Sequence, residues 1–136
     1  MANGIYAKGR EAFATGLINW PSDDIRLVLV DTAAYTVNLA THTYLSDVAV
    51  GSRVATLSAS LGSKSATDGI LNAASATLNS VTGPTAEALV FYKHTGTDST
   101  ARLLLYIDTM TGLPVTPNGG NIILNWDTGT NKIAKL

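Results

Sequence analysis

The chain has 136 residues, of which 46% are hydrophobic and 14% are charged, and its net charge at pH 7 is −1. This length and hydrophobic content predict one folded domain that spans residues 1–136, because two separate cores would need a longer chain. The near-neutral charge and the lack of any Lys/Arg cluster argue against direct binding to nucleic acid. The sequence contains no cysteine, which excludes disulfides, thiolate metal sites and cysteine nucleophiles.

Charged residues near the start of the chain argue against a targeting segment. Lys8, Arg10 and Glu11 interrupt the apolar positions there, so we expect no signal peptide. No later apolar stretch approaches the roughly 20 residues that a membrane-spanning helix needs. We therefore expect a protein that is made and assembled in a cytoplasm and has no membrane partner.

Residues 4–16 are predicted to form an α-helix, with Asn3 as a candidate N-cap and Gly16 as a candidate C-cap. Gly9 within this helix costs about 1 kcal/mol relative to Ala, so the helix needs tertiary support. Either the chain's own domain or a neighbouring subunit supplies that support. We expect the neighbour, which would make residues 1–20 an N-terminal arm with these candidate interface residues: Ile5, Tyr6, Phe13 and Trp20.

Hydrophobic periodicity predicts β-strands for most of the remaining chain. Ile25 to Asp31 is almost entirely apolar and is expected to lie in the centre of a sheet. Ala88 to Lys93 and Arg102 to Asp108 flank a Gly-containing turn, which predicts an antiparallel hairpin. The other predicted elements are a short helix within Thr41 to Val48 and strands at Arg53 to Leu57, Ala74 to Val81, Ile122 to Trp126 and Lys132 to Leu136, the last two as a closing hairpin.

About seven short strands separated by turn residues predict a mostly β fold, an antiparallel β-sandwich or barrel over residues 25–136, with one short N-terminal α-helix. Its core is expected to include Leu29, Val90 and Leu104.

The segment from Thr109 to Asn121 has no predicted regular structure, and a loop this long in a small domain tends to be functional. Its two prolines limit its freedom, so docking would cost it less entropy than a Gly/Ser loop. We predict a contact loop, with Leu113, Pro114 and Pro117 as candidate interface residues.

One motif resembles a catalytic signature. Asp127-Thr128-Gly129 matches the Asp-Thr-Gly of aspartic proteases, in which two carboxylates share a proton. Only seven residues follow Gly129, too few for the flap and downstream structure of such a site. An Asx turn at the end of a strand is the favoured interpretation.

The remaining chemistry is sparse. The chain has two histidines, His42 and His94, both in Thr-rich segments where a solvated side chain is expected. Gly62-Ser63-Lys64-Ser65 resembles the end of a phosphate-binding loop but lacks the first glycine and the preceding strand. The sequence therefore predicts a non-enzymatic protein with no catalytic, metal-binding or cofactor-binding residues.

Several stretches resemble a family of small virion structural proteins of tailed bacteriophages: Met1 to Phe13, Asp24 to Thr32, Tyr92 to Asp98, Thr111 to Gly120, Trp126-Asp127 and Asn131 to Ile133. The resemblance covers nearly the whole chain and is least distinctive over Ser58 to Asn72. It implies a virion protein, with capsid decoration or a minor head role favoured. The expected assembly is a homo-oligomer, with a trimer favoured, that bridges major capsid proteins.

A second function remains open, that of a tail or baseplate component or a receptor- or glycan-binding module. A glycan binder is expected to expose an aromatic platform beside polar loops, whereas a capsid-stabilising protein is expected to keep its aromatic residues inside contacts. The low charge content favours a surface that another protein can cover at little desolvation cost.

Overall fold

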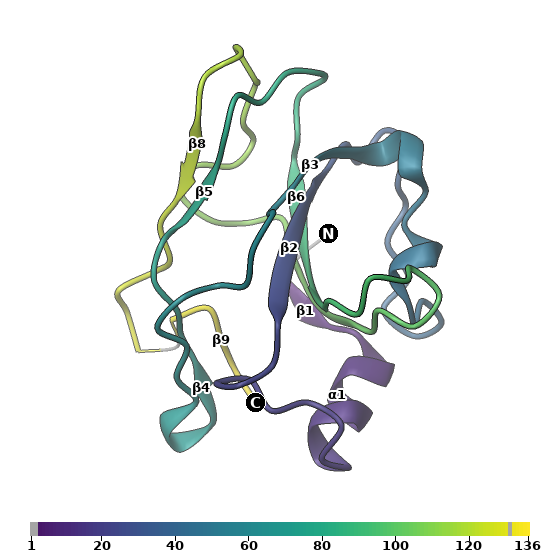
Figure 1. Ribbon diagram of the computed structural model, residues 1–136, viewed down its shortest axis with the longest axis vertical. Helices are drawn as coiled ribbons and strands as arrows, with labels where there is room; N and C mark the ends of the chain where they lie inside the picture. Colours follow the sequence, from purple (N-terminus) through teal and green to yellow (C-terminus); the bar gives the residue numbers. More distant parts are fainter. Residues whose placement is uncertain (1–2, 131) are drawn as a thin grey trace.

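The structure is a computed structural model that describes residues 3–130 and 132–136 (Figure 1). Met1 and Ala2 of the predicted arm and Asn131 of the predicted C-terminal turn lie outside the described residues. The largest element is a five-stranded antiparallel sheet, the central sheet, with strands in the order β1-β7-β6-β2-β3. Its strands are β1 (Gly4–Ile5), β2 (Ile25–Val30), β3 (Arg53–Thr56), β6 (Ala88–Lys93) and β7 (Leu103–Ile107).

Two smaller antiparallel sheets face the central sheet, one formed by β4 and β9 and the other by β5 and β8. Their strands are β4 (Ile70–Leu71), β5 (Ala76–Leu78), β8 (Ile122–Leu124) and β9 (Ala134–Lys135). The described residues also form one α-helix, α1 (Ala7–Ala14), and three 3-10 turns, η1 (Leu45–Asp47), η2 (Val50–Ser52) and η3 (Thr67–Gly69). The prediction of a mostly β, antiparallel fold with an N-terminal helix is confirmed. The barrel alternative is wrong, because the central sheet ends in two edges, β1 and β3.

Both faces of the central sheet are buried. In β2, Ile25, Leu27 and Leu29 enter one hydrophobic core, whereas Val28 and Val30 enter a second core on the opposite face. A sheet that is covered on both sides needs nearly continuous apolar strands, which explains the uninterrupted apolar sequence of β2, β6 and β7. The three predicted core residues are fully buried, as expected: Leu29, Val90 and Leu104.

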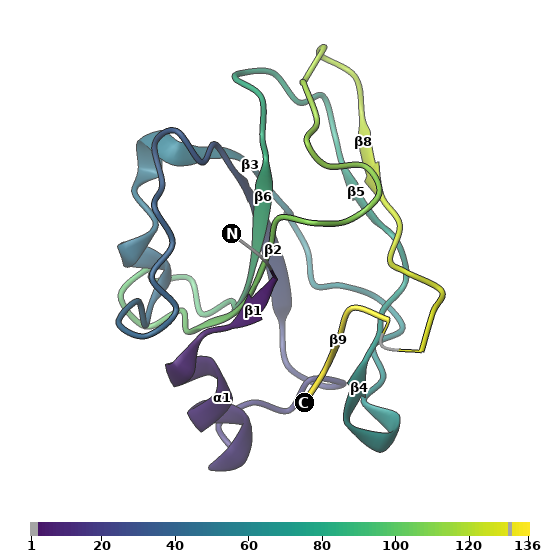
Figure 2. The ribbon, with the colours of Figure 1, turned by 180° about the vertical axis from the view of Figure 1, so that it is seen from behind.

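Two layers cover the two faces, as Figures 1 and 2 show. The small-sheet layer consists of residues 69–86 and 109–126 and contains β4, β5 and β8. The loop layer consists of residues 31–52 and 94–101 and contains η1 and η2. The central sheet thus lies between a layer with its own short strands and a layer built almost entirely from loops.

The helix α1 packs closely on β7, and Gly9 makes this contact possible. A Cβ atom at position 9 would lie 2.8 Å from the carbonyl oxygens of Leu103 and Leu104. The pairing of β6 with β7 shifts register at this point, so Leu104 and Leu105 both face the core under the small-sheet layer. Gly9 weakens the isolated helix, but it lets the helix backbone approach the strand.

Two local predictions at the N-terminus are wrong. The helix begins at Ala7 because Gly4 and Ile5 form β1, which pairs with β7. Asn3 does not cap the helix, because its side chain donates to the carbonyl oxygen of Thr109 at 3.0 Å and accepts the backbone N–H of the same residue at 2.9 Å. The start of the chain is therefore an edge strand of the central sheet.

The predicted closing hairpin is also wrong. β8 pairs with β5 and β9 pairs with β4, so the two last strands join different sheets. The helix predicted within 41–48 is reduced to the single 3-10 turn η1. The Asp47 carboxylate orders this turn by accepting the backbone N–H groups of Thr43 and Tyr44 at 2.7 and 3.1 Å.

Candidate functional site

The N-terminal candidate residues pack on the chain itself. Tyr6 is 0% exposed and Trp20 is 2% exposed, and the ring centroids of Trp20 and Phe91 are 5.9 Å apart. Ile5 and Phe13 are half-buried and pack against the same core as Trp20. The expectation that this segment docks on a neighbouring subunit through Tyr6 and Trp20 is therefore wrong, because the chain's own sheet covers both side chains.

Tyr6 belongs to a buried chain of hydrogen bonds. Its hydroxyl lies 2.8 Å from the hydroxyl of Tyr35, which lies 2.8 Å from Nδ1 of His42. The backbone N–H of Asn38 also donates to Nδ1, so this nitrogen is an acceptor and Tyr35 donates to it. His42 is thus a half-buried acceptor and not the solvated side chain expected from the sequence. Burial raises the pKa of the Tyr6 hydroxyl, which remains a donor.

The predicted contact loop is ordered by backbone hydrogen bonds. Val115 and Ala86 exchange two of them, each 2.9 Å long. Leu113 and Pro117 are half-buried, and Leu113 packs against the core, whereas Pro114 is exposed. The loop therefore offers a preformed surface, and its role in contacts stays a prediction.

The two groups of predicted interface residues are not equally available for contact, because Tyr6 and Trp20 are buried in the chain's own cores. Figure 1 shows α1 at one end of the molecule and the turns that follow β5 and precede β8 at the other end. The structure gathers a different set of residues on one side.

That set is the small-sheet layer, whose residues 69–86 and 109–126 include no charged residue; β9, which pairs with β4 and carries Lys135, lies outside it. No Asp, Glu, Lys, Arg or His occurs between Asp68 and Glu87 or between Asp108 and Asp127. The two uncharged segments pair with each other through β5 and β8 and cover the same face of the central sheet. The fold therefore concentrates the uncharged part of the sequence in one layer.

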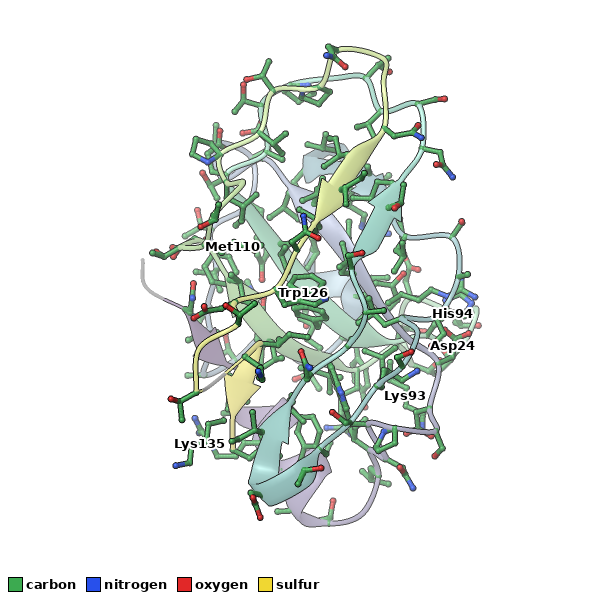
Figure 3. The ribbon with its side chains drawn as sticks, turned by 90° about the vertical axis from the view of Figure 1, so that its left-hand side faces the viewer. Asp24, Lys93, His94, Met110, Trp126 and Lys135 are labelled. Atoms are coloured by element: carbon green, nitrogen blue, oxygen red, sulfur yellow. The ribbon has the colours of Figure 1, made fainter. Side chains whose placement is uncertain are left out.

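Figure 3 looks onto this layer. Trp126 lies near its centre, whereas the charged residues Asp24, Lys93 and Lys135 lie towards its rim. Trp126 packs on the central sheet and donates from Nε1 to the carbonyl oxygen of Ala74 at 2.9 Å. The layer is thus anchored from within and presents its neutral side chains outward.

Apart from Ile123, the exposed residues of the layer are Ala, Gly, Pro, Ser, Thr or Asn. Such side chains lose little rotamer entropy on burial, and none carries a charge that would have to be desolvated. Another protein could cover this surface at low cost. The exposed residues of the layer are Ala74, Ser75, Thr77, Asn79, Ser80, Thr82, Gly83, Pro84, Thr109, Thr111, Gly112, Pro114, Thr116, Asn118, Gly119, Gly120, Asn121, Ile123 and Asn125.

A groove of about 570 Å³ lies beside β8 at one margin of the layer. Ile123 of β8 lines it with 59% of its surface exposed, the largest exposed apolar side chain of the layer. Met110 and Trp126, both labelled in Figure 3, line it together with the polar Asn125 and the charged Asp127 and Lys132. The groove combines an apolar lining with polar neighbours, an arrangement typical of protein contact surfaces.

The motif that resembles a protease signature borders the same groove. Oδ1 of the exposed Asp127 accepts the backbone N–H of Gly129 at 3.0 Å, so the predicted Asx turn is confirmed. Within residues 3–130 and 132–136, no group of three or more His, Cys, Asp or Glu side chains is placed to hold a metal ion. No helix in the described part of the chain is long and apolar enough to cross a membrane.

Comparison with known proteins adds no family. A scan against protein-family models finds no match, and a search of curated proteins also finds none. The surface of the small-sheet layer is therefore the main structural observation that bears on function.

The sequence alone did not predict this layer, although the two uncharged segments that form it can be seen there. The two uncharged segments can be read directly from the sequence, since each is bounded by acidic residues. Their pairing could not be read, because the predicted partner of β8 was the C-terminal strand. The low overall charge content is visible in the sequence, but the concentration of uncharged residues on one face depends on the fold.

Proposed function

We propose that this protein is a non-enzymatic structural subunit of a tailed-bacteriophage virion that binds a neighbouring virion protein through its small-sheet layer. The observation that carries the proposal is the absence of charged side chains from the 36 residues of that layer, two segments of 18 (69–86 and 109–126) that cover one face of the central sheet. Charged residues are depleted from the buried centres of protein interfaces because their desolvation is costly. The resemblance of the sequence to virion proteins supplies the biological setting.

Capsid decoration is the favoured role within that setting, with the major capsid protein as the partner and a trimer as the assembly. A subunit that stiffens a shell needs a rigid contact surface, and the small-sheet layer is held by paired strands and by the bridge between Ala86 and Val115. A preformed surface loses little conformational entropy when it binds.

The positions of the aromatic residues favour this role over a glycan-binding module. The chain has two Trp, five Tyr and two Phe residues, and all lie in the described ranges. Each of these side chains is buried or half-buried, so the described surface offers no exposed aromatic platform for a sugar. This pattern is the one expected of a protein whose contacts are made with other proteins.

A charge placed on the small-sheet layer tests the proposal. Thr77 on β5 and Thr56 on β3 are both exposed strand residues, but only Thr77 belongs to the layer. We expect Thr77→Lys to reduce incorporation into purified particles by tenfold or more, because binding would bury an unpaired ammonium group. Each factor of ten corresponds to roughly 1.4 kcal/mol of binding free energy. Thr56→Lys should be incorporated at the wild-type level, and both variants should keep the wild-type melting temperature within a few degrees.

Quantifying the chain per particle distinguishes the virion roles. Hundreds of copies per particle support capsid decoration, whereas a few dozen or fewer indicate a tail or baseplate position. Equal incorporation of the two lysine variants would show that the small-sheet layer is not the contact surface. Absence of the wild-type chain from particles would overturn the virion proposal itself.

A further inference from the structure

A second cavity, of about 360 Å³, lies between the central sheet and the loop layer, away from the surface proposed above to bind a virion partner. Its lining includes the cationic side chains of Arg26 and Arg53, the hydroxyl-bearing Tyr92, the ring of His94 and the carboxylate of Asp98. Four of these five side chains can donate hydrogen bonds, and only Asp98 is an anion. The cavity is therefore rich in donors.

Arg53 is a cation held in place by the backbone. Its Nε donates to the carbonyl oxygen of Val48 at 2.9 Å and its Nη2 donates to that of Leu45 at 2.8 Å. The Nη1 atom donates to Asp98, whose side chain is 49% exposed. Two backbone carbonyl groups thus fix the orientation of the Arg53 guanidinium. Its carboxylate partner, Asp98, is half exposed to solvent, so another carboxylate can take its place.

Tyr92 supplies a hydroxyl that has no hydrogen-bond partner among the described residues. The side chain is only 2% exposed, yet no described residue forms a hydrogen bond with its hydroxyl. No fully buried side-chain nitrogen or oxygen atom in the described residues lacks a partner, so this hydroxyl must reach the space of the cavity. Burial raises the pKa of Tyr92, Arg26 and Arg53 lower it, and Asp24 and Asp98 raise it, as expected of a hydroxyl near both guanidinium groups and their carboxylate partners.

Arg26 and His94 complete the set of donors. Arg26 lies directly across from Tyr92 in the pairing of β2 with β6, and its Nε and Nη2 bind Asp24, which leaves the Nη1 hydrogens available. The ring of His94 lies 6.4 Å from that of Tyr92 and makes no hydrogen bond with a described residue. Unused donors from two strands therefore converge on one cavity.

We propose that this cavity binds a carboxylate, which replaces Asp98 on Arg53 and accepts a hydrogen bond from the Tyr92 hydroxyl. A planar guanidinium in a fixed orientation matches a carboxylate well, and a hydrogen bond to a charged acceptor is stronger than one between neutral groups. The ligand is either a small free acid or the side chain of Asp or Glu on another protein. The inference does not depend on the proposed virion function.

Amide chemical shifts measured by NMR test the site in the full chain. Acetate represents a free acid, N-acetylglutamate N-methylamide represents a protein side chain, and each is titrated at constant ionic strength against sodium chloride. We expect saturable shifts at the amides of residues 92–98 with at least one carboxylate and none with chloride. The probe that binds more tightly identifies the source of the carboxylate.

Three variants give the site a signature that a purely structural role would not produce. Tyr92→Phe should weaken binding about tenfold, because it removes a hydrogen bond to a charged group and keeps the packed ring. Asp98→Asn should tighten binding by a factor of about two to five, because it removes the exposed competitor for Arg53. Tyr106→Phe is the matched control, since Tyr106 is 3% exposed and its hydroxyl has no hydrogen-bond partner among the described residues, but it does not line the cavity. Its binding should be that of the wild-type chain.

The proposal fails if no carboxylate gives saturable shifts at residues 92–98, if inorganic phosphate binds there more tightly than every carboxylate, or if Asp98→Asn weakens binding. It also fails if Tyr106→Phe and Tyr92→Phe weaken binding equally.

Discussion

The two layers that cover the central sheet differ in their aromatic residues. Both Trp and both Phe residues pack in or against the core under the small-sheet layer. Four of the five tyrosines, Tyr6, Tyr35, Tyr92 and Tyr106, lie in the core under the loop layer. A tyrosine ring is apolar but its hydroxyl needs a hydrogen-bond partner or water, so tyrosine suits a core that is covered by polar loops.

The layers also differ in how they are ordered. In the loop layer, Asp31, Asp47 and Asp98 each bind a backbone N–H or an arginine, so charged side chains hold the loops in place. In the small-sheet layer, backbone pairing of β5 with β8 and apolar packing serve that purpose. The charged side chains of the loop layer therefore form contacts within the molecule. The small-sheet layer has no charged side chains, and its outer surface is neutral.

The N-terminal segment contributes to both cores, so removing it should have the largest effect. Tyr6 enters the core under the loop layer, and Trp20 enters the core under the small-sheet layer. We expect deletion of residues 2–20 to abolish cooperative unfolding, because it removes an edge strand and two large buried side chains, each worth several kcal/mol. Thermal melts followed by circular dichroism provide the measurement.

The matched control for this deletion is Leu17→Ala, which alters an exposed residue of the same segment and should leave the melting temperature unchanged. A truncated chain that folds with the wild-type melting temperature would contradict the structure and would restore the interpretation of this segment as an intersubunit arm.

Trp126→Ala should separate the small-sheet layer from the central sheet. Its ring lies 5.3 Å from that of Phe91, and its Nε1 holds the backbone at Ala74. We expect a loss of about 3–5 kcal/mol in the free energy of unfolding, measured in urea. Hydrogen exchange should show the first loss of protection in residues 69–86 and 109–126. Ile123→Ala, a substitution at an exposed site of the same layer, should change the free energy of unfolding by at most about 0.5 kcal/mol.

The sequence predicted the central strands well because their patterns are strong. Ala88–Lys93 was predicted with the bounds that the structure shows, and β5 lies within the strand predicted over Ala74 to Val81. These elements are specified by local periodicity alone. The packing role of Gly9 was not predictable, because it depends on a contact with β7 that lies almost a hundred residues away.

The errors concern pairing and docking, which local patterns do not specify. β8 and β9 are adjacent in sequence but join different sheets, and Gly4 and Ile5 were assigned to a helix because their pairing with β7 is distant. The docking site of Tyr6 and Trp20 was also predicted wrongly, because local sequence does not show whether an apolar side chain packs on the chain's own sheet or on a neighbouring subunit. The uncharged segments were visible, but only the fold shows that they share a face.

The smallest expected effect comes from alkaline pH, which should act on one layer and spare the other. Burial raises the pKa of Tyr6, Tyr35, Tyr92 and Tyr106 above the ordinary value of 10, and that of Tyr106 reaches about 12. As the pH rises through 10, the unfolded chain releases these protons first, so folding stability decreases with pH.

At pH 10, each of these tyrosines should lower the free energy of unfolding, because its hydroxyl ionises more readily in the unfolded chain than in the folded one. The four tyrosines belong to the core under the loop layer, whereas the core under the small-sheet layer contains none. Hydrogen exchange between pH 8 and pH 10, corrected for the intrinsic exchange rate, should therefore show earlier loss of protection in residues 31–52 and 94–101 than in residues 69–86 and 109–126.

Tyr92→Phe removes one of the four ionisable hydroxyls and should therefore reduce this dependence of stability on pH. It should not greatly change stability at pH 7, since the Tyr92 hydroxyl has no partner in the described chain. If the two layers lose protection together, the cores unfold as one cooperative unit and their different aromatic composition has no consequence for local stability.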